Sequence, residues 1–416
     1  MVGGFDRYFQ FARCFRDEDL RADRQPEFTQ IDVEMSFVTM QDVMDLGERV
    51  CKNMWAAAGY EIPSQSFRHM TYTEAMTSYG CDKPDLRFDM RLTNLDAPFI
   101  NSSADFLNIA ANEKSKSVVG FNLGKWSKSM SRKDVDALVK QVRASGCQTA
   151  TFIQVSANDS EWTWKSSIAK FLTNDNKEQL KRTLSLQEGD MVIVGLGATN
   201  KTLEAMGKVR LQCATELERK GLPVRPLKGS ANEFEFLWVT DFPLFTPEEE
   251  PEQSSTPSES DSNHSATMRL GTTHHPFTAP HADDMKYLNG TVEGMMKIRG
   301  QHFDLVVNGV ELGGGSIRIH SSDVQRKVLQ DCLKVDAENF EHLLTALESG
   351  CPPHGGFALG FDRAMALLTH AESLRDVIAF PKSFSGKEPM TSSPAPLSQE
   401  DLDVYNLQFR PAVNGV

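Results

Sequence analysis

The sequence predicts an α+β fold in which an inserted α/β region splits a main domain built on antiparallel strands. Two runs of alternating polar and apolar residues near the N-terminus, 8–16 and 28–37, indicate the two strands of a hairpin. Two further strand candidates, 303–310 and 316–320, follow much later in the chain. Helix-like and strand-like patterns alternate between these two groups of strands, which is typical of an α/β unit.

The composition is that of an acidic globular protein. The chain has 416 residues, a net charge of −13 and 40% apolar residues, and this length allows two or three domains with cores of their own. No apolar run approaches the roughly 18 to 20 residues needed to cross a bilayer, so we expect a soluble protein without a membrane partner. The N-terminus also lacks the apolar core of a secretory signal. The acidic balance disfavours non-specific nucleic-acid binding but allows a local basic patch that contacts one RNA.

The seven cysteines are scattered and form no CxxC pair. An odd number of unpaired cysteines favours reduced thiols in an intracellular compartment and disfavours a disulfide framework or a zinc ribbon. Cys351 and His354 have a ligand-like spacing, but no second pair matches them, so a four-ligand zinc site is disfavoured.

The first strand candidates enclose a long, charged loop, 17–27, and a helix pattern follows at 40–58. Hairpin loops of this length tend to be functional. The inserted region contains an amphipathic helix at 131–144, for which Ser131 and Asp134 form a capping pair. Its other expected elements are strands at 150–155 and 191–197 and a helix at 201–220.

The second half returns to strands and then ends in helices. Residues 234–245 are strand-like, and the acidic, Ser/Pro-rich stretch after them predicts a disordered loop. Helices are expected at 322–334, at 337–349 with Gly350 as its terminator, and at 361–370. The predicted domain ranges are 1–93 and 213–382 for the two parts of the main domain, 94–212 for the insertion, 246–271 for the disordered loop and 383–416 for a C-terminal extension.

Three arginines in the charged hairpin loop, Arg16, Arg21 and Arg24, suit a polyanionic ligand. A guanidinium group is planar and can grip a phosphate or a carboxylate through two parallel hydrogen bonds. Taken alone, the same run is more typical of a solvated, charged loop without a ligand, which explains most charge runs.

A second constellation combines two acids, a run of glycines and an arginine. Asp304 and Glu311 lie on neighbouring strand positions and could share a hard cation such as Mg²⁺, which prefers oxygen ligands. Glycines 313–315 would let a ligand approach the backbone, and Arg318 would project from the next strand. The alternative is a glycine-bulged hairpin with an incidental surface arginine.

A glycine-rich run at 355–360 leads into the last helix pattern, which contains Arg363. In this arrangement backbone N–H groups and the helix dipole could face an anion. The run is neither a P-loop nor a dinucleotide-binding fingerprint. A plain turn between a strand and a helix is the alternative interpretation.

Together, and in this order, these segments resemble the class II aminoacyl-tRNA synthetases. Residues 5–37 resemble motif 2, in detail that of the aspartate-specific family, and residues 355–368 resemble motif 3. Further segments that resemble the aspartate family are 79–87, 238–245, 274–280 and 311–320. The insertion is similar to the GAD domain of the bacterial and mitochondrial type. The implied fold is an antiparallel sheet flanked by helices with a GAD-like α/β insertion.

The resemblance implies an aspartate–tRNA ligase that uses ATP and Mg²⁺. Aspartate would react with ATP to give aspartyl-adenylate, and the aspartyl group would pass to the 3′ end of tRNA(Asp) without a covalent enzyme intermediate. The implied ATP-binding residues are Arg16, Glu18, Gln25, Phe28, Glu311, Gly360 and Arg363, of which Arg16, Glu311 and Arg363 are the implied catalytic residues. The implied aspartate-binding residues are Arg16, Asp32, His274 and Arg318, and the implied metal ligands are Asp304 and Glu311.

Several of these implied roles are specific. Arg16 would bridge the substrate carboxylate and the α-phosphate, and Phe28 and Arg363 would sandwich the adenine ring. Arg318, helped by His274, would pair with the side-chain carboxylate of aspartate. A buried guanidinium loses its charge partner when it faces the neutral amide of asparagine, which would explain selection of the acid.

The resemblance also shows what the sequence leaves out. Motif 1, which builds the dimer interface of the family, and the anticodon-binding OB-fold have no counterpart before residue 5. We therefore expect a chain cut off on its N-terminal side whose full-length form is a homodimer. A non-catalytic fragment with a tRNA-binding or regulatory role is the alternative function, and an amidotransferase subunit that shares the GAD domain is disfavoured. Mitochondria are the expected location, with a bacterial-type cytoplasm as the alternative.

One short run resembles a different class. Residues 125–129, Lys-Trp-Ser-Lys-Ser, resemble the KMSKS signature of class I synthetases. That signature requires a HIGH-type partner and a parallel nucleotide-binding fold, and the sequence indicates neither. The run is therefore interpreted as a surface loop of the insertion.

Overall fold

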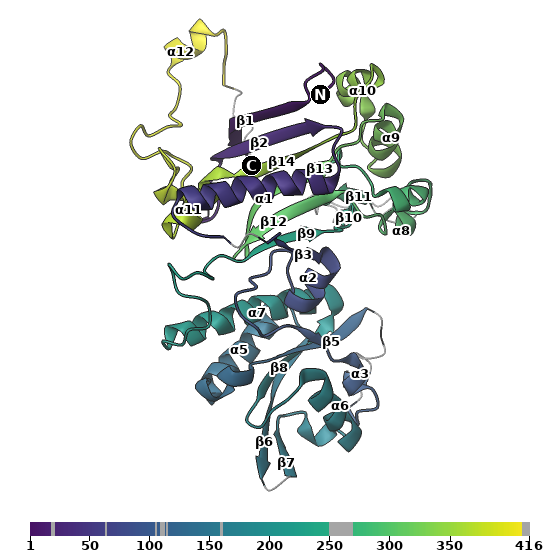
Figure 1. Cartoon of the computed structure of the whole chain (residues 1–416), viewed down its shortest axis with the longest axis vertical. Coiled ribbons are helices and arrows are strands. Elements are labelled where there is room, and N and C mark those ends of the chain that lie inside the picture. The colour runs from purple at the N-terminus through teal and green to yellow at the C-terminus, as the bar shows by residue number, and fades with distance from the viewer. Residues whose placement is uncertain are drawn as a thin grey trace. The chain divides into compact units, whose positions relative to one another are not determined.

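The computed structural model describes the chain except for residues 18–20, 63–64, 105, 109–112, 114, 159–160, 249–268 and 410–416. The chain forms two compact units, one of residues 1–8 and 33–357 and the other of residues 9–32 and 358–416. Figure 1 labels their helices and strands. Within the described residues, no helix has both the length and the apolar character that crossing a bilayer requires.

The first unit contains a seven-stranded sheet. In spatial order its strands are β1 (Arg7–Phe15), β2 (Glu27–Ser36), β14 (His354–Gly360), β13 (Val310–Ile317), β12 (His302–Val307), β9 (Phe236–Thr240) and β3 (Arg68–Thr71). Three of these strands, β1, β2 and β14, also have residues in the second unit. The pairs β12–β13 and β12–β9 are antiparallel, and β3 joins β9 in parallel. The predicted α+β class, an antiparallel sheet flanked by helices, is thus confirmed.

Alternation along β9 places one helix on each face of this sheet. Trp238 faces α1 (Met40–Ala57), where a Cβ atom on Gly47 would lie 3.1 Å from the indole, so α1 approaches the sheet closely at a glycine. Leu237 and Val239 face the other way and pack with residues of α2 (Tyr72–Tyr79). The cross-strand partner of Asp304 is Val239. Residues directly opposite each other on neighbouring strands share a face of the sheet, so Asp304 lies on the α2 face.

The inserted region forms a second, five-stranded sheet with helices on both faces (Figure 1). In spatial order its strands are β4 (Thr93–Asn94), β5 (Lys116–Asn122), β8 (Met191–Ala198), β6 (Thr149–Asn158) and β7 (Glu161–Lys165). Val119, Phe121 and Ile193 pack with residues of α5 (Arg132–Ala144) and α7 (Thr199–Arg219). Val118, Val192 and Val194 pack on the opposite face with residues of α3 (Asp96–Phe99) and α6 (Asn174–Leu184).

Two glycines bring α2 and α7 into backbone contact. A Cβ atom on Gly207 would lie 2.5 Å from the carbonyl oxygen of Tyr79, and one on Gly80 would overlap the carbonyl oxygen of Leu203. Gly80 ends α2 with a positive φ of 70°, which a glycine adopts without strain. No side chain fits between these two backbones.

The remaining elements of the first unit are short. They are β10 (Phe245–Glu248), β11 (Arg269–Thr272), α8 (Val292–Met295), α9 (Ser322–Lys327), α10 (Glu341–Glu348), the 3₁₀ segments Gly124–Ser129, Ala169–Phe171, Ala282–Asn289 and Ala337–Phe340, and the π-helical segment Val328–Cys332. Most of the predicted loop 246–271 lies outside the described residues. Its two described ends form the antiparallel pair β10–β11.

The second unit holds the rest of β1 and β2, the end of β14, α11 (Phe361–Thr369), a 3₁₀ turn at Leu374–Asp376 and α12 (Gln399–Val404). The hairpin strands predicted at 8–16 and 28–37 occur one residue earlier in the chain, as β1 and β2. Residues 18–20 of the loop between them lie outside the described residues, while Arg21 and Arg24 form an isolated β-bridge.

Two strand predictions were wrong. The run 234–245 is broken after Thr240, because Asp241 adopts a positive φ of 57° and ends the strand. The strand predicted at 316–320 begins earlier, at Val310, and runs through all three glycines to Ile317. The glycines belong to the strand because they allow it to pack closely: a Cβ atom on Gly315 would overlap the carbonyl oxygen of Gly356 on β14.

Candidate active site

The two acids predicted as metal ligands lie on one face of the β12–β13 hairpin. Asp304 pairs with Gly314, Val306 pairs with Glu311, and a bulge between Leu305 and Val306 shifts the register between these two pairs. Residues directly or diagonally opposite on antiparallel strands share a face, so the two carboxylates are neighbours. A Cβ atom on Gly314 would lie 2.6 Å from Asp304 Oδ1, so this glycine leaves room for the carboxylate.

The acid pair is electrostatically strained. Burial, the charge of Glu311 and the charge of Asp82 raise the pKa of Asp304 well above its ordinary value, and Lys83 partly opposes this shift. Two hard oxygen donors that repel each other fit a divalent cation. Among the described residues no cluster of three or more His, Cys, Asp or Glu side chains could hold a metal by itself. A cation at this pair would therefore need further oxygens from a ligand or from water.

Arg318 is held by three side chains of the first unit. Its Nη2 donates to Glu34 Oε1 at 2.7 Å, and its Nη1 donates to Ser316 Oγ at 2.8 Å and contacts His275 Nε2. The second carboxylate oxygen of Glu34 is buried and has no hydrogen-bond partner among the described residues. The predicted arginine is thus partly buried and oriented, beside an acceptor oxygen that a ligand could use.

Three histidines form a stack next to Arg318. His302 stacks on His274 at a centroid distance of 5.4 Å, and His274 lies 4.5 Å from His275. His275, which was not singled out from the sequence, contacts Arg318, while the predicted His274 has its Nδ1 3.5 Å from Thr278 Oγ1. Burial and the charge of Arg318 lower the pKa of His275 to about 3, so its ring is neutral and can accept the guanidinium hydrogen.

His302 gives a pH-dependent prediction. Burial and the neighbouring His274 lower its pKa to about 3, and neither ring nitrogen has a hydrogen-bond partner among the described residues. The unfolded chain therefore gains a proton below pH 6.5 that the folded chain does not, so stability falls as the pH drops from 6.5 towards 3. His302→Phe keeps the stacking and removes this proton.

The slope of unfolding free energy against pH between about 6 and 4 should therefore be shallower in His302→Phe by about 1.4 kcal/mol per pH unit. Urea unfolding of both proteins at pH 7.5, 6, 5 and 4 measures this difference. Identical slopes for the variant and the wild type would contradict a buried, neutral His302.

The second unit carries the predicted nucleotide-binding residues of the motif 2 hairpin and the last helix. The guanidinium carbon of Arg16 lies 5.6 Å from the centroid of the Phe28 ring. Asp362, in the first turn of α11, accepts a hydrogen bond from the backbone N–H of Thr29 at 2.7 Å. This bond fixes the start of α11, and with it Arg363, against the strand position that follows Phe28.

Gly360 is the N-cap residue of α11, but the other glycines of the run 355–360 lie within β14. The glycine-rich run, predicted to direct backbone N–H groups at an anion, is therefore a strand, and only its last residue borders a helix N-terminus. Packing accounts for the glycines, because a Cβ atom on Gly355 would lie 2.6 Å from Ile317 Cδ1 and one on Gly356 would lie 2.5 Å from the carbonyl oxygen of Val33.

The remaining predicted residues of this unit differ in their surroundings. Gln25 is buried, and its Oε1 accepts the backbone N–H of Lys382 at 2.8 Å, so it anchors the C-terminal segment in the described structure. Gln10 Nε2 donates to Asp32 Oδ2 at 3.4 Å. Glu18 lies outside the described residues. The described predicted residues thus lie in both units, with Asp304, Glu311, His274 and Arg318 in the first and Arg16, Gln25, Phe28, Asp32, Gly360 and Arg363 in the second.

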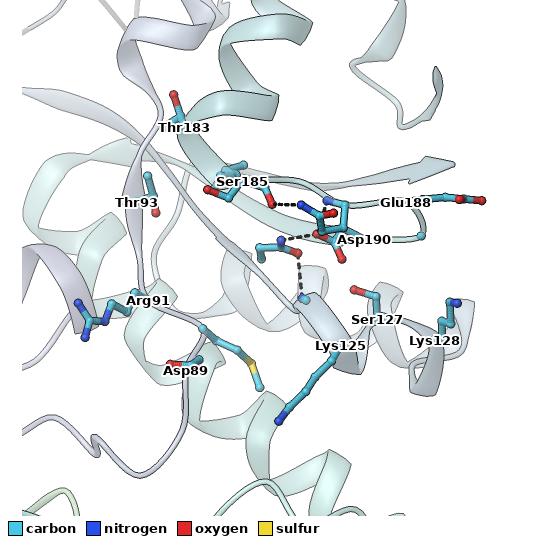
Figure 2. A pocket seen from close by; sticks show the side chains of 16 residues that line it. Asp89, Arg91, Thr93, Lys125, Ser127, Lys128, Thr183, Ser185, Glu188 and Asp190 are labelled. Atoms are coloured by element: carbon cyan, nitrogen blue, oxygen red, sulfur yellow. Dashed lines mark hydrogen bonds between the residues drawn. The ribbon is translucent and has the colours of Figure 1, made fainter. Parts of the chain in front are cut away.

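The inserted region has a hollow of its own, with a volume of about 960 Å³ (Figure 2). Its lining includes Lys125, Ser127 and Lys128 from the run that resembles KMSKS, but no predicted site residue. Ser127 is buried, and its hydroxyl accepts the backbone N–H of Met191 at 2.9 Å. Ser127 therefore has a structural role, while Lys125 and Lys128 are exposed.

Comparison with known proteins connects these features to one family. Residues 1–384 match the family described as tRNA synthetases class II (D, K and N). The mitochondrial aspartate–tRNA ligase of Dictyostelium discoideum is 44% identical over 418 residues, which cover 97% of this chain and 57% of that protein. The mitochondrial aspartate–tRNA ligase of Rattus norvegicus is 43% identical, covering 98% of this chain and 58% of that protein.

Bacterial relatives are nearly as similar. The aspartate–tRNA(Asp/Asn) ligase of Opitutus terrae is 40% identical over 414 residues, which cover 98% of this chain and 64% of that protein. The chain thus spans 57% to 64% of the length of these three relatives. Among solved structures, asparaginyl-tRNA synthetase of Entamoeba histolytica in complex with asparaginyl-adenylate matches 94% of this chain and 55% of that chain, at 13% identity and a TM-score of 0.42.

Proposed function

Because the chain belongs to the family of class II tRNA synthetases (D, K and N), we propose that it is the catalytic part of an aspartate–tRNA ligase. It activates L-aspartate with ATP and transfers the aspartyl group to tRNA(Asp). The observation that carries this choice among the three amino acids is the environment of Arg318. A guanidinium oriented by Glu34, Ser316 and a neutral histidine can pair with a carboxylate of the substrate, repels the ammonium group of lysine and gains no further charge partner from asparagine.

The residues supply positioning and charge neutralisation. In the activation step the α-carboxylate of aspartate attacks the α-phosphorus of ATP, the bond to the bridging oxygen breaks, and pyrophosphate leaves. Arg16 neutralises the negative charge that grows on the α-phosphate, and the Phe28 ring offers a stacking surface for adenine. Arg363 is the second cation proposed to contact the nucleotide. Glu18, Gln25 and Gly360 are the further proposed ATP contacts, and Asp32 and His274 the further aspartate contacts.

The acid pair would hold Mg²⁺, which when bound supplies positive charge that offsets the phosphate charge. The donor chemistry supports this assignment, since Asp304 and Glu311 are oxygen ligands on one sheet face and repel each other without a cation.

The test is ATP–pyrophosphate exchange with aspartate, asparagine and lysine supplied separately. We expect exchange with aspartate, and much less with asparagine or lysine. Exchange that is faster with either of these two amino acids contradicts the specificity. Absence of exchange with all three, together with binding of tRNA, would favour the alternative, a non-catalytic fragment with a tRNA-binding or regulatory role.

Three finer assignments are also proposals. The names of the eukaryotic relatives favour a mitochondrial location over a bacterial-type cytoplasm, which imaging of a tagged full-length protein in its own cells tests. The names of the bacterial relatives raise charging of tRNA(Asn) as a second activity, which aminoacylation of both purified tRNAs tests. The full-length enzyme is proposed to be a homodimer with a GAD-like insertion, which light scattering tests for the oligomeric state.

A further inference from the structure

The last residue of α2 and the segment after it, residues 79–91, are held in place by buried charges. Arg210 of α7 is buried and donates hydrogen bonds to the carbonyl oxygens of Asp85, Phe88, Asp89 and Met90 at 2.9 to 3.3 Å. The carboxylate of Asp85 receives hydrogen bonds from Arg87 at 2.8 and 2.9 Å and from Arg225 at 2.8 Å. A segment whose carbonyl groups and carboxylate are satisfied in this way has one defined conformation.

This segment lies on the sheet face that carries the acid pair. Tyr79, Cys81 and Leu86 pack with Val239 and Val306, which are the cross-strand partners of Asp304 and Glu311. The turn between β12 and β13 touches the same segment, because a Cβ atom on Gly309 would lie 3.0 Å from Asp85 Cβ. The segment therefore packs against the β12–β13 hairpin at two places, beside Asp304 and Glu311 and at the turn between the two strands.

Lys83 lies at the middle of this segment, between Cys81 and Asp85. Lys83 is exposed. The charges that act on Asp304 come from Glu311, Asp82 and Lys83, of which only Lys83 lowers its pKa. The charge of Lys83 therefore acts on Asp304, and the packing of Cys81, Leu86 and Asp85 places Lys83 in the part of the segment that lies against the β12–β13 hairpin.

We propose that Lys83 is a phosphate-binding residue, whose ammonium group donates hydrogen bonds to the oxygens of the terminal phosphates of ATP, and of free pyrophosphate, beside Asp304 and Glu311. This inference rests on the proposed function. A lysine ammonium carries three donors and a compact charge, which suits non-bridging phosphate oxygens. Asp304 and Glu311 would hold a divalent cation, and the ammonium group of Lys83 would offset phosphate charge that the cation leaves uncompensated.

The experiment measures pyrophosphate binding by titration calorimetry in the presence of Mg²⁺, with the full chain. Lys83→Met removes the charge and keeps the length of the side chain, Lys83→Arg keeps the charge, and Lys140→Met is the matched control at an exposed lysine of α5. We expect Lys83→Met to weaken binding by about 10- to 100-fold, the effect of one hydrogen bond to a charged group. Lys83→Arg should stay within a few fold of the wild type, and Lys140→Met should equal it.

Three results would overturn the inference: equal affinities of the wild type and Lys83→Met, absence of pyrophosphate binding to the wild type, and an equal loss in the Lys140→Met control. Exchange kinetics separate this inference from the proposed function. Lys83→Met should raise the KM for ATP and for pyrophosphate and leave the KM for aspartate unchanged. A wild type that binds pyrophosphate through Lys83 but activates no aspartate would refute the function and leave the phosphate site standing.

Discussion

Arg318→Ala is expected to reduce aspartate-dependent ATP–pyrophosphate exchange by about 30- to 4000-fold, since truncation of one partner of a buried, hydrogen-bonded charge pair costs about 2 to 5 kcal/mol. The side chains of Arg318 and Glu34 are 21% and 30% exposed, so solvent screens this pair only in part. The substitution removes the proposed partner of the substrate carboxylate. It also leaves Glu34, whose Oε2 already lacks a hydrogen-bond partner among the described residues, without its arginine.

Two further variants sharpen this prediction. Arg318→Lys retains the positive charge. An ammonium group lacks the planar arrangement of donors with which the guanidinium group would contact Glu34, Ser316 and the substrate at once, so most of the loss of exchange activity should remain. Arg326→Ala is the control, because this arginine of α9 forms only partly exposed ion pairs with Glu341 and Glu348. The rate of exchange at saturating ATP, with aspartate varied, measures the effect. Activity of Arg318→Ala within threefold of the wild type would exclude Arg318 as the carboxylate-binding residue.

Asp304→Asn should have opposite effects on activity and on stability. The rate of exchange should fall on the order of 10³-fold, because the proposed cation loses a charged ligand and the transition state loses several kcal/mol of stabilisation. Without Mg²⁺, however, the variant should be more stable than the wild type by about 0.5 to 2 kcal/mol. Asparagine removes a carboxylate that is buried beside Glu311 and keeps the shape that Gly314 accommodates.

Thermal unfolding with EDTA and with Mg²⁺ measures this difference in stability. Mg²⁺ should raise the Tm of the wild type, because a ligand that binds only the folded state stabilises it, and should have a much smaller effect on Asp304→Asn. Asp331→Asn, at an exposed position of the segment Val328–Cys332, serves as the matched control. If Asp304→Asn lowers the Tm in EDTA, the acid pair contributes to folding through another partner and is a poor candidate for a cation site.

Local signals predicted much of the fold. The alternation in residues 8–16 and 28–37 gave the hairpin within one residue, although the burial of β2 is uniform along its length. The capping pair of Ser131 and Asp134 is observed, with both reciprocal hydrogen bonds at the start of α5. In contrast, β5 was not predicted. Five of its seven residues are buried, and strands covered on both faces lose the alternation that identifies them.

The site was harder to predict where contacts between residues far apart in the chain determine the backbone conformation or the partner of a side chain. The run of residues 313–315 suggested a break between strands, whereas contact with Gly356, about forty residues away in the chain, makes it a strand. His274 and His275 are adjacent, and the sequence does not tell which ring reaches Arg318. Glu34 was overlooked because it is one of ten residues in β2, and only its hydrogen bond to Arg318 distinguishes it.

The backbone contact between α2 and α7 at Gly80 and Gly207 connects the inserted region to the segment of the proposed phosphate site. Two backbones that touch without side chains between them cannot slide past each other without steric overlap. Arg210, three residues further along the same helix, grips the carbonyl groups that follow Lys83. A displacement of α7 would therefore displace the segment that carries Lys83, so the position of the inserted region and that of the proposed phosphate site would be coupled.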